Sequence, residues 1–131
     1  MSDSNKPAFA PQLYIPNGTT DIGFYTKGLG AVEVMRFSND DGSVHVAEFS
    51  INGTIFHVHE NTVRFSLFDP VRSNGSSTVI GLFVDDVHAY MERAIAAGAT
   101  EISPTTDYDY GYRQGEVRDP FGHVWMFEKK I

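Results

Sequence analysis

Two similar segments, 68 residues apart, constrain the fold of this chain more than any other feature of its sequence. Residues 30–34 (GAVEV) recur as residues 98–102 (GATEI). The turn at Asn52 and Gly53, with the apolar residues after it, recurs at Phe121 and Gly122, at an offset of 69 residues. Near-equal offsets at several landmarks predict two copies of one supersecondary unit.

Each copy is predicted to contain a strand, a helix and three further strands, which defines an α+β chain of two βαβββ modules. Alternating or continuous apolar runs mark the strands. In the first copy they are expected at residues 12–15, 31–37, 44–51 and 54–59. In the second copy they are expected at residues 79–84, 100–103, 115–118 and 123–128.

The helices are predicted from capping residues and helical spacing of apolar residues. Thr19 or Thr20 is expected to cap a short helix in the first copy, which ends at the glycines of positions 28 and 30. Asp85 or Asp86 is expected to cap the helix of the second copy, and Gly98 is expected to stop it.

The predicted boundaries follow from this repeat. Residues 1–8 form an N-terminal arm, and residues 9–131 form a single domain. Module one covers about residues 9–60 and module two about residues 79–131. Between them lies a connector at about 61–78, of which residues 72–78 (RSNGSST) are expected to be flexible because they are small and polar.

The Asn52-Gly53 pair also predicts the register of a hairpin, and the register decides which side chains share a face. In a two-residue turn, Phe49 lies opposite Phe56 on a core-facing side. Glu48 then lies opposite His57 on the other face, where His59 also lies.

Composition excludes several classes of function. The formal net charge is −7, and the sequence pI is about 5.0, so nucleic acids and anionic membranes are not expected partners. The chain has no cysteine, which excludes disulfides and thiolate metal sites. The longest uncharged apolar run, residues 79–84, is too short to span a bilayer. No secretory signal is recognised at the N-terminus, so a cytoplasmic location is expected.

Three segments carry a resemblance to a known family. They are residues 23–31 (GFYTKGLGA), residues 84–87 (VDDV) and residues 118–125 (RDPFGHVW). The chain resembles the vicinal oxygen chelate superfamily, which is the glyoxalase, bleomycin-resistance and extradiol-dioxygenase group, and in particular its small glyoxalase-like proteins. The resemblance implies paired βαβββ modules that form a cup-shaped sheet, and a homodimer.

The resemblance also implies one divalent metal, held by the first and last strands of each module. Counting from the landmarks places the four ligand positions near Ala10, His57, Val79 and Met126. Three of these residues are apolar and cannot hold Zn²⁺, Ni²⁺ or Fe²⁺ in the family manner. The favoured hypothesis is therefore that the chain binds a small molecule in the cup without the family metal and without another cofactor.

An alternative stays open, because a register shift of two residues moves the ligand set to Gln12, His59, Gly81 and Glu128. A site of His57, His59 and Glu128 would then hold Zn, Ni, Mn or Fe in a metal-dependent lyase, isomerase or dioxygenase. The residues do not decide whether the protein is an enzyme.

Residues expected to line the cup are the candidate ligand-binding residues. They are Gln12, Tyr14, Glu48, His57, His59, Phe83, Tyr110, Arg113, Met126 and Glu128. Tyr108, Tyr110 and Tyr112 alternate along the chain, and with Arg113 they are expected to form an aromatic lid.

The remaining histidines are expected outside the ligand site. A structural or surface role is predicted for His45 and an exposed position for His88. For His123 we expect a hydrogen bond that stabilises a turn.

Overall fold

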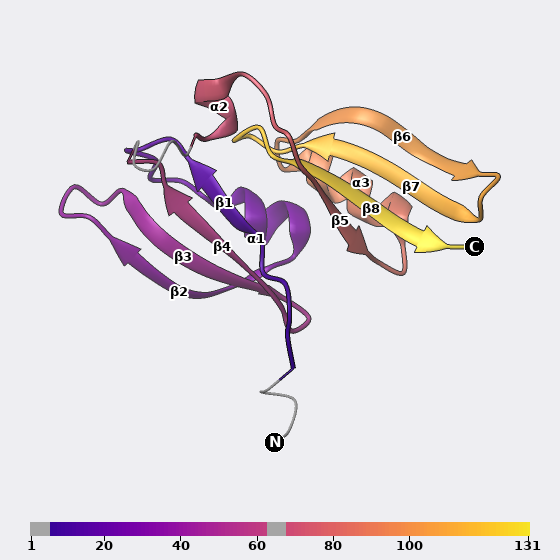
Figure 1. Cartoon of the computed structure of the whole chain (residues 1–131), viewed down its shortest axis with the longest axis horizontal. Helices are drawn as coiled ribbons and strands as arrows, with labels where there is room; N and C mark the ends of the chain where they lie inside the picture. The colour runs from indigo at the N-terminus through magenta and orange to yellow at the C-terminus, as the bar shows by residue number, and fades with distance from the viewer. Residues whose placement is uncertain (1–5, 63–67) are drawn as a thin grey trace.

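The computed structural model describes residues 6–62 and 68–131, which form two four-stranded sheets lying side by side (Figure 1). Module one contains β1 (Gln12–Ile15), α1 (Phe24–Leu29), β2 (Val32–Ser38), β3 (Val44–Ile51) and β4 (Thr54–Glu60). Module two contains β5 (Val79–Phe83), α3 (Val87–Ala96), β6 (Thr100–Tyr108), β7 (Tyr112–Arg118) and β8 (Val124–Lys130). A four-residue helix, α2 (Pro70–Ser73), lies between them.

The two sheets repeat one topology, which confirms the predicted pair of βαβββ modules. Their strand orders are β1-β4-β3-β2 and β5-β8-β7-β6. In each sheet the first strand runs parallel to the last, and the other pairs are antiparallel. In each module the helix and two strands form the connection between the parallel strands, because parallel neighbours need a long connection.

The hairpin register predicted for β3 and β4 is confirmed. Phe49 pairs with Phe56, and Glu48 pairs with His57. The turn between the strands has positive φ at Asn52 (50°) and Gly53 (91°). A type I′ turn requires this geometry, and its twist matches that of the two strands.

The hydrophobic core lies between the sheets and the helices. Its largest fully buried side chains include Tyr25, Phe49, Phe56, Trp125 and Phe127. Helix α1 packs against α3, so the two modules share one core at the centre of the molecule (Figure 1). Along β3 and β4, buried residues alternate with half-buried ones. The half-buried residues form the face of the module-one sheet opposite the helix.

The first helix begins differently from the prediction. Neither Thr19 nor Thr20 caps it. The residue before α1 is Gly23, which makes no side-chain capping hydrogen bond. The Thr19 hydroxyl instead donates to the carbonyl of Pro16, at 2.6 Å. A threonine that closes the preceding turn in this way is a common alternative to capping.

In module two, the cap prediction is confirmed and two strand lengths are corrected. Asp86 caps α3 by accepting a hydrogen bond from the backbone N–H of Ala89, at 3.0 Å. Strands β6 and β7 extend to Tyr108 and from Tyr112, well beyond the predicted residues 100–103 and 115–118. Polar residues obscured these extensions in the sequence, because cross-strand pairing rather than apolar alternation holds them.

The segment at 72–78, which was expected to be flexible, begins inside a short helix. Residues 70–73 form α2, which Asp69 caps by accepting from the backbone N–H of Arg72. The segment at 61–71 carried no prediction, and its residues 63–67 lie outside the described part. Among the helices that the structure describes, none is long and apolar enough to cross a membrane.

Candidate functional site

Four polar side chains meet on the face of the module-one sheet opposite the helix, and we call them the module-one cluster: Gln12, Glu48, His57 and His59. Strand pairing brings them together. Gln12 on β1 pairs with His57 on β4, and His57 pairs with Glu48 on β3. Directly paired residues point to the same side of a sheet. His59 follows two positions after His57 and so shares its face.

A continuous chain of hydrogen bonds links these side chains. His57 Nε2 lies 3.1 Å from Glu48 Oε1, and His57 Nδ1 lies 2.9 Å from Gln12 Nε2. Gln12 Oε1 lies 2.6 Å from His59 Nε2. Gln12 Nε2 also donates to the carbonyl of Ala10, at 3.1 Å. The predicted contact between Glu48 and His57 is therefore present, and Gln12 connects the two histidines.

His59 packs against an aromatic ring. Its imidazole stacks on Tyr14, with the ring centroids 5.3 Å apart. Burial lowers the pKa of His59 from its ordinary value, and the nearby His57 and His45 lower it further. The neutral imidazole is therefore the favoured form of His59 at neutral pH.

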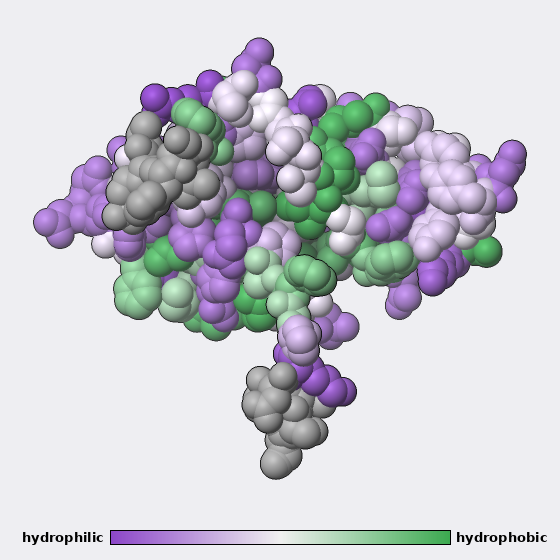
Figure 2. All heavy atoms as spheres, viewed as in Figure 1, coloured by the Kyte–Doolittle hydropathy of each residue, from purple (hydrophilic) through white to green (hydrophobic). Residues whose placement is uncertain are grey.

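A groove of about 700 Å³ lies beside the cluster. Gln12, Tyr14 and His123 line it together with the connector residues 75–78 and Ile80 of β5. The hydrogen bond expected to stabilise the turn is made by the His123 backbone N–H, which donates to Asp119 Oδ1 at 3.0 Å. The ring of His123 donates from Nε2 to the carbonyl oxygen of Tyr14 at 2.8 Å and so links the two modules. Figure 2 shows a hydrophobic band along β5, next to the hydrophilic side chains of the module-one sheet.

A second group of polar and aromatic side chains lies on module two. We call it the module-two cluster, and its members are Phe83, Tyr110, Tyr112, Gln114 and Glu128. Gln114 Nε2 donates to Glu128 Oε1 at 2.9 Å, and the Tyr110 hydroxyl donates to Gln114 Oε1 at 2.6 Å. The rings of Phe83 and Tyr112 lie 6.2 Å apart, centroid to centroid. Sequence reasoning missed Gln114, although its pairing with Glu128 follows once β7 is extended.

A glycine makes room for the Glu128 carboxylate. A Cβ atom at Gly81 would lie 2.6 Å from Glu128 Oε2, so this position leaves space that any side chain would fill. Gly81 lies opposite Met126 on the neighbouring strand, and Met126 is half-buried on the same face as Glu128.

The structure directs Arg113 away from the tyrosines expected to share a lid with it. Its Nε donates to Asp107 Oδ1 at 2.7 Å. Arg113 lies between Tyr112 and Gln114 on β7, so its side chain leaves the strand on the opposite face. Tyr108 and Tyr110 stack at 5.3 Å without it. Of the remaining histidines, His45 contacts Glu60, and His88 is exposed on α3.

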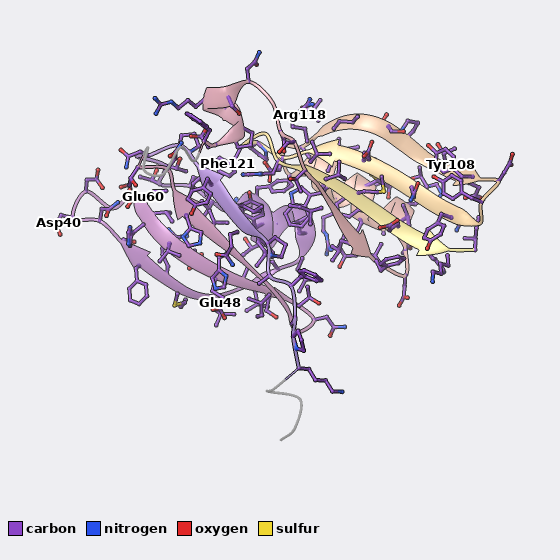
Figure 3. All side chains as sticks on the ribbon, in the orientation of Figure 1. Asp40, Glu48, Glu60, Tyr108, Arg118 and Phe121 are labelled. Carbon is purple, nitrogen blue, oxygen red and sulfur yellow. The ribbon has the colours of Figure 1, made fainter. Side chains whose placement is uncertain are left out.

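The His57, His59 and Glu128 set is not assembled within one chain. In residues 6–62 and 68–131, no three histidine or acidic side chains are grouped as a metal site. His57 and His59 belong to the module-one sheet and Glu128 to the module-two sheet. Figure 3 shows how far the modules reach apart, with Glu48 on one sheet and Tyr108 at the far tip of the other.

The donor set also does not fit the metal that the family resemblance implies. The residues beside His57 and Met126 on the parallel first strands are Gln12 and Gly81, rather than Ala10 and Val79. In module two, therefore, Met126 offers only a thioether as a metal ligand, and Gly81 offers no side chain at all. A thioether is a soft ligand that does not suit Zn²⁺, Ni²⁺, Mn²⁺ or Fe²⁺.

The arrangement of two α+β modules with one topology is found in many solved structures. The X-ray structure of a gene product from Arabidopsis thaliana superposes with a TM-score of 0.71, at 27% sequence identity over 95% of this chain and 99% of that chain. The crystal structure of TioX from Micromonospora sp. ML1 gives a TM-score of 0.69 at 23% identity, over 95% of this chain and all of that one.

Sequence comparison then assigns the family. Residues 12–127 match the Glyoxalase/Bleomycin resistance protein/Dioxygenase superfamily, and the chain belongs to this superfamily. An uncharacterized protein of Mycobacterium bovis is 34% identical over 134 aligned residues, which cover all of this chain and 88% of the relative. An uncharacterized protein of Mycobacterium tuberculosis shows the same identity over 79% of its own length.

Proposed function

We propose that this protein binds a small molecule on the module-one sheet, at Gln12, Glu48, His57 and His59. The observation that carries the proposal is the module-one cluster itself, a set of linked polar side chains beside a groove of about 700 Å³. Small-molecule sites are concave and combine apolar walls with a few convergent polar groups. The hydrophobic band along β5 supplies such a wall (Figure 2).

We propose further that this binding does not use the metal typical of the superfamily. The support is the donor set: Gly81 and Met126 occupy the module-two positions that face one another across the parallel strands. The alternative, a metal-dependent lyase, isomerase or dioxygenase, would need Glu128 from module two beside His57 and His59.

The experiment combines metal analysis with a binding screen on untagged protein. We expect no stoichiometric Zn, Ni, Mn or Fe, and we expect fragments to shift the imidazole NMR signals of His57 and His59. His88→Ala is the matched control, because His88 is an exposed histidine on α3. Near-stoichiometric metal that is lost in a His57→Ala/His59→Ala variant and kept in the control would contradict the metal-free proposal.

We also propose that the protein acts as a homodimer in the cytoplasm. Support for the dimer comes from β2, an edge strand on which Val32, Val34 and Phe37 are more than half exposed. Exposed apolar side chains on an edge strand favour association with another chain. Light scattering of the purified protein should give twice the chain mass of 14.5 kDa, and Phe37→Glu should shift it toward the monomer. Cell fractionation would test the location.

A further inference from the structure

One backbone carbonyl determines which side chains of the module-one cluster donate hydrogen bonds and which accept them. The oxygen of Ala10 can only accept, so the Gln12 atom that lies 3.1 Å from it must be the amide nitrogen. The two hydrogens of this nitrogen then go to Ala10 and to Nδ1 of His57. The orientation of the Gln12 amide is therefore fixed by chemistry as well as by position.

This orientation fixes the tautomers of both histidines. Because His57 accepts at Nδ1, its proton is on Nε2, where it donates to Glu48 Oε1. Because Gln12 Oε1 can only accept, His59 carries its proton on Nε2 and donates there. Every N–H of the Gln12, His57 and His59 side chains is thus used inside the cluster.

Only acceptors are left for a ligand. In the part of the chain that the structure describes, Nδ1 of His59 and Oε2 of Glu48 have no hydrogen-bond partner. Glu48 accepts a hydrogen bond from His57, and no described lysine or arginine forms an ion pair with it. The Glu48 and His57 side chains are about one-quarter exposed, at 28% and 23%, so a ligand can reach them.

The module-two cluster shows the same arrangement of hydrogen bonds with different residues: its donors are directed within the cluster, and a carboxylate oxygen is left open. The Tyr110 hydroxyl donates to Gln114, and Gln114 donates to Glu128 Oε1. Glu128 Oε2 has no hydrogen-bond partner among the described residues and lies over Gly81. In both modules, a glutamine donates a hydrogen bond within the cluster and one carboxylate oxygen stays open.

We propose that the module-one cluster binds its ligand through a protonated amine, which donates to the open carboxylate oxygen Oε2 of Glu48. This inference rests on the proposed function and names the class of ligand. An ammonium group supplies the donors that the cluster lacks, and its charge complements Glu48. A carboxylate or phosphate finds no N–H in the cluster and is repelled by Glu48. Tyr14, stacked on His59, offers a flat wall to the apolar part of the ligand.

The test uses three probes of one shape: benzylamine, benzyl alcohol and benzoate. Each is titrated into the full-length protein while the imidazole signals of His57 and His59 are followed by NMR. We expect benzylamine to bind about tenfold more tightly than benzyl alcohol, since a tenfold ratio needs only about 1.4 kcal/mol, which is slightly less than one hydrogen bond to a charged group contributes. We expect no shift with benzoate.

A charge-matched pair of variants separates the site from the net charge. Glu48→Gln should weaken benzylamine binding about tenfold and leave benzyl alcohol binding little changed. Glu92→Gln removes the same charge from an exposed position on α3 and should leave both affinities unchanged. Equal weakening in the two variants would overturn the inference.

The outcomes also distinguish the inference from the proposed function. Benzoate binding as tightly as benzylamine at the same histidines would overturn the choice of an amine and leave small-molecule binding supported. If benzylamine shifts neither imidazole signal while other fragments of a diverse library shift those of His57 and His59, the choice of an amine is likewise overturned and small-molecule binding stays supported. If no fragment of that library shifts these signals, both the inference and the proposed function are refuted.

Discussion

Replacing Asp119 with alanine should remove a large part of the stability of this protein. Asp119 is 3% exposed and accepts four hydrogen bonds. Two come from the Tyr25 hydroxyl at 2.8 Å and the Trp125 indole N–H at 3.0 Å. The other two come from the backbone N–H groups of Phe121 and His123, at 2.9 and 3.0 Å. One carboxylate therefore joins α1, β8 and the turn before β8.

The expected cost follows from the donors that lose their partner. Tyr25 and Trp125 are at most 1% exposed, so water cannot replace the carboxylate at either side chain. A buried donor left unsatisfied costs about 1–3 kcal/mol, so the pair costs about 2–6 kcal/mol. A domain of ordinary stability has only about 5–15 kcal/mol in all.

The assay is urea unfolding followed by the fluorescence of Trp125, the single tryptophan of the chain. Asp119→Ala should lower the free energy of unfolding by at least about 2 kcal/mol. Asp109→Ala is the matched control, because it removes the same carboxylate from an exposed hairpin tip. Tyr25→Phe should cost less than Asp119→Ala, since it leaves Trp125 paired. A loss below about 1 kcal/mol for Asp119→Ala would refute the reasoning.

Two further predictions concern stability. The hydrogen bond from His45 is the main cause that lowers the pKa of Glu60 below its ordinary value of 4.5. A lowered pKa means that the ionised carboxylate stabilises the folded state. This stabilisation is present above the unfolded-state pKa and is lost as the pH falls through the folded-state pKa. Glu60→Gln should therefore lower the melting temperature at pH 7, and the difference from the natural protein should shrink below pH 4.5; a constant difference from pH 7 to pH 3 would contradict this. At Gly122 (φ 93°), a Cβ atom would lie 2.6 Å from Pro70 Cβ, whereas at Gly18 (φ 92°) it would meet nothing within 4 Å. Both Gly→Ala variants cost about 1–2 kcal/mol for the left-handed backbone, and Gly122→Ala should cost more; equal melting temperatures would show that the contact with Pro70 is relieved freely.

The fold was predictable because its signals are local or repeated. The two similar segments at 30–34 and 98–102 predicted two modules, and the topology confirms them. The Asn52-Gly53 turn predicted the register of β3 and β4 to the residue. Both signals depend on short-range chemistry: a turn that needs positive φ and side chains that alternate along a strand.

The site was predictable only in part. Glu48 and His57 face each other because one hairpin joins them, and the sequence shows that hairpin. Gln12 lies between His57 and His59 because β1 pairs in parallel with β4, 45 residues along the chain. No short-range pattern fixes the register of such a distant pair. Gln114 was missed for a related reason, since cross-strand pairing extends β7 past the apolar residues that marked it.

The sequence by itself determined the two-module organisation, the acidic and cysteine-free character, and the face on which Glu48, His57 and His59 lie. The tertiary structure decided which of the candidates meet. It separates Glu128 from the two histidines, turns Arg113 toward Asp107, and places Gln12 where one backbone carbonyl sets the direction of every hydrogen bond in the cluster. The physical reason is that periodicity assigns a side chain to a face, whereas contacts between distant strands depend on how the whole chain packs.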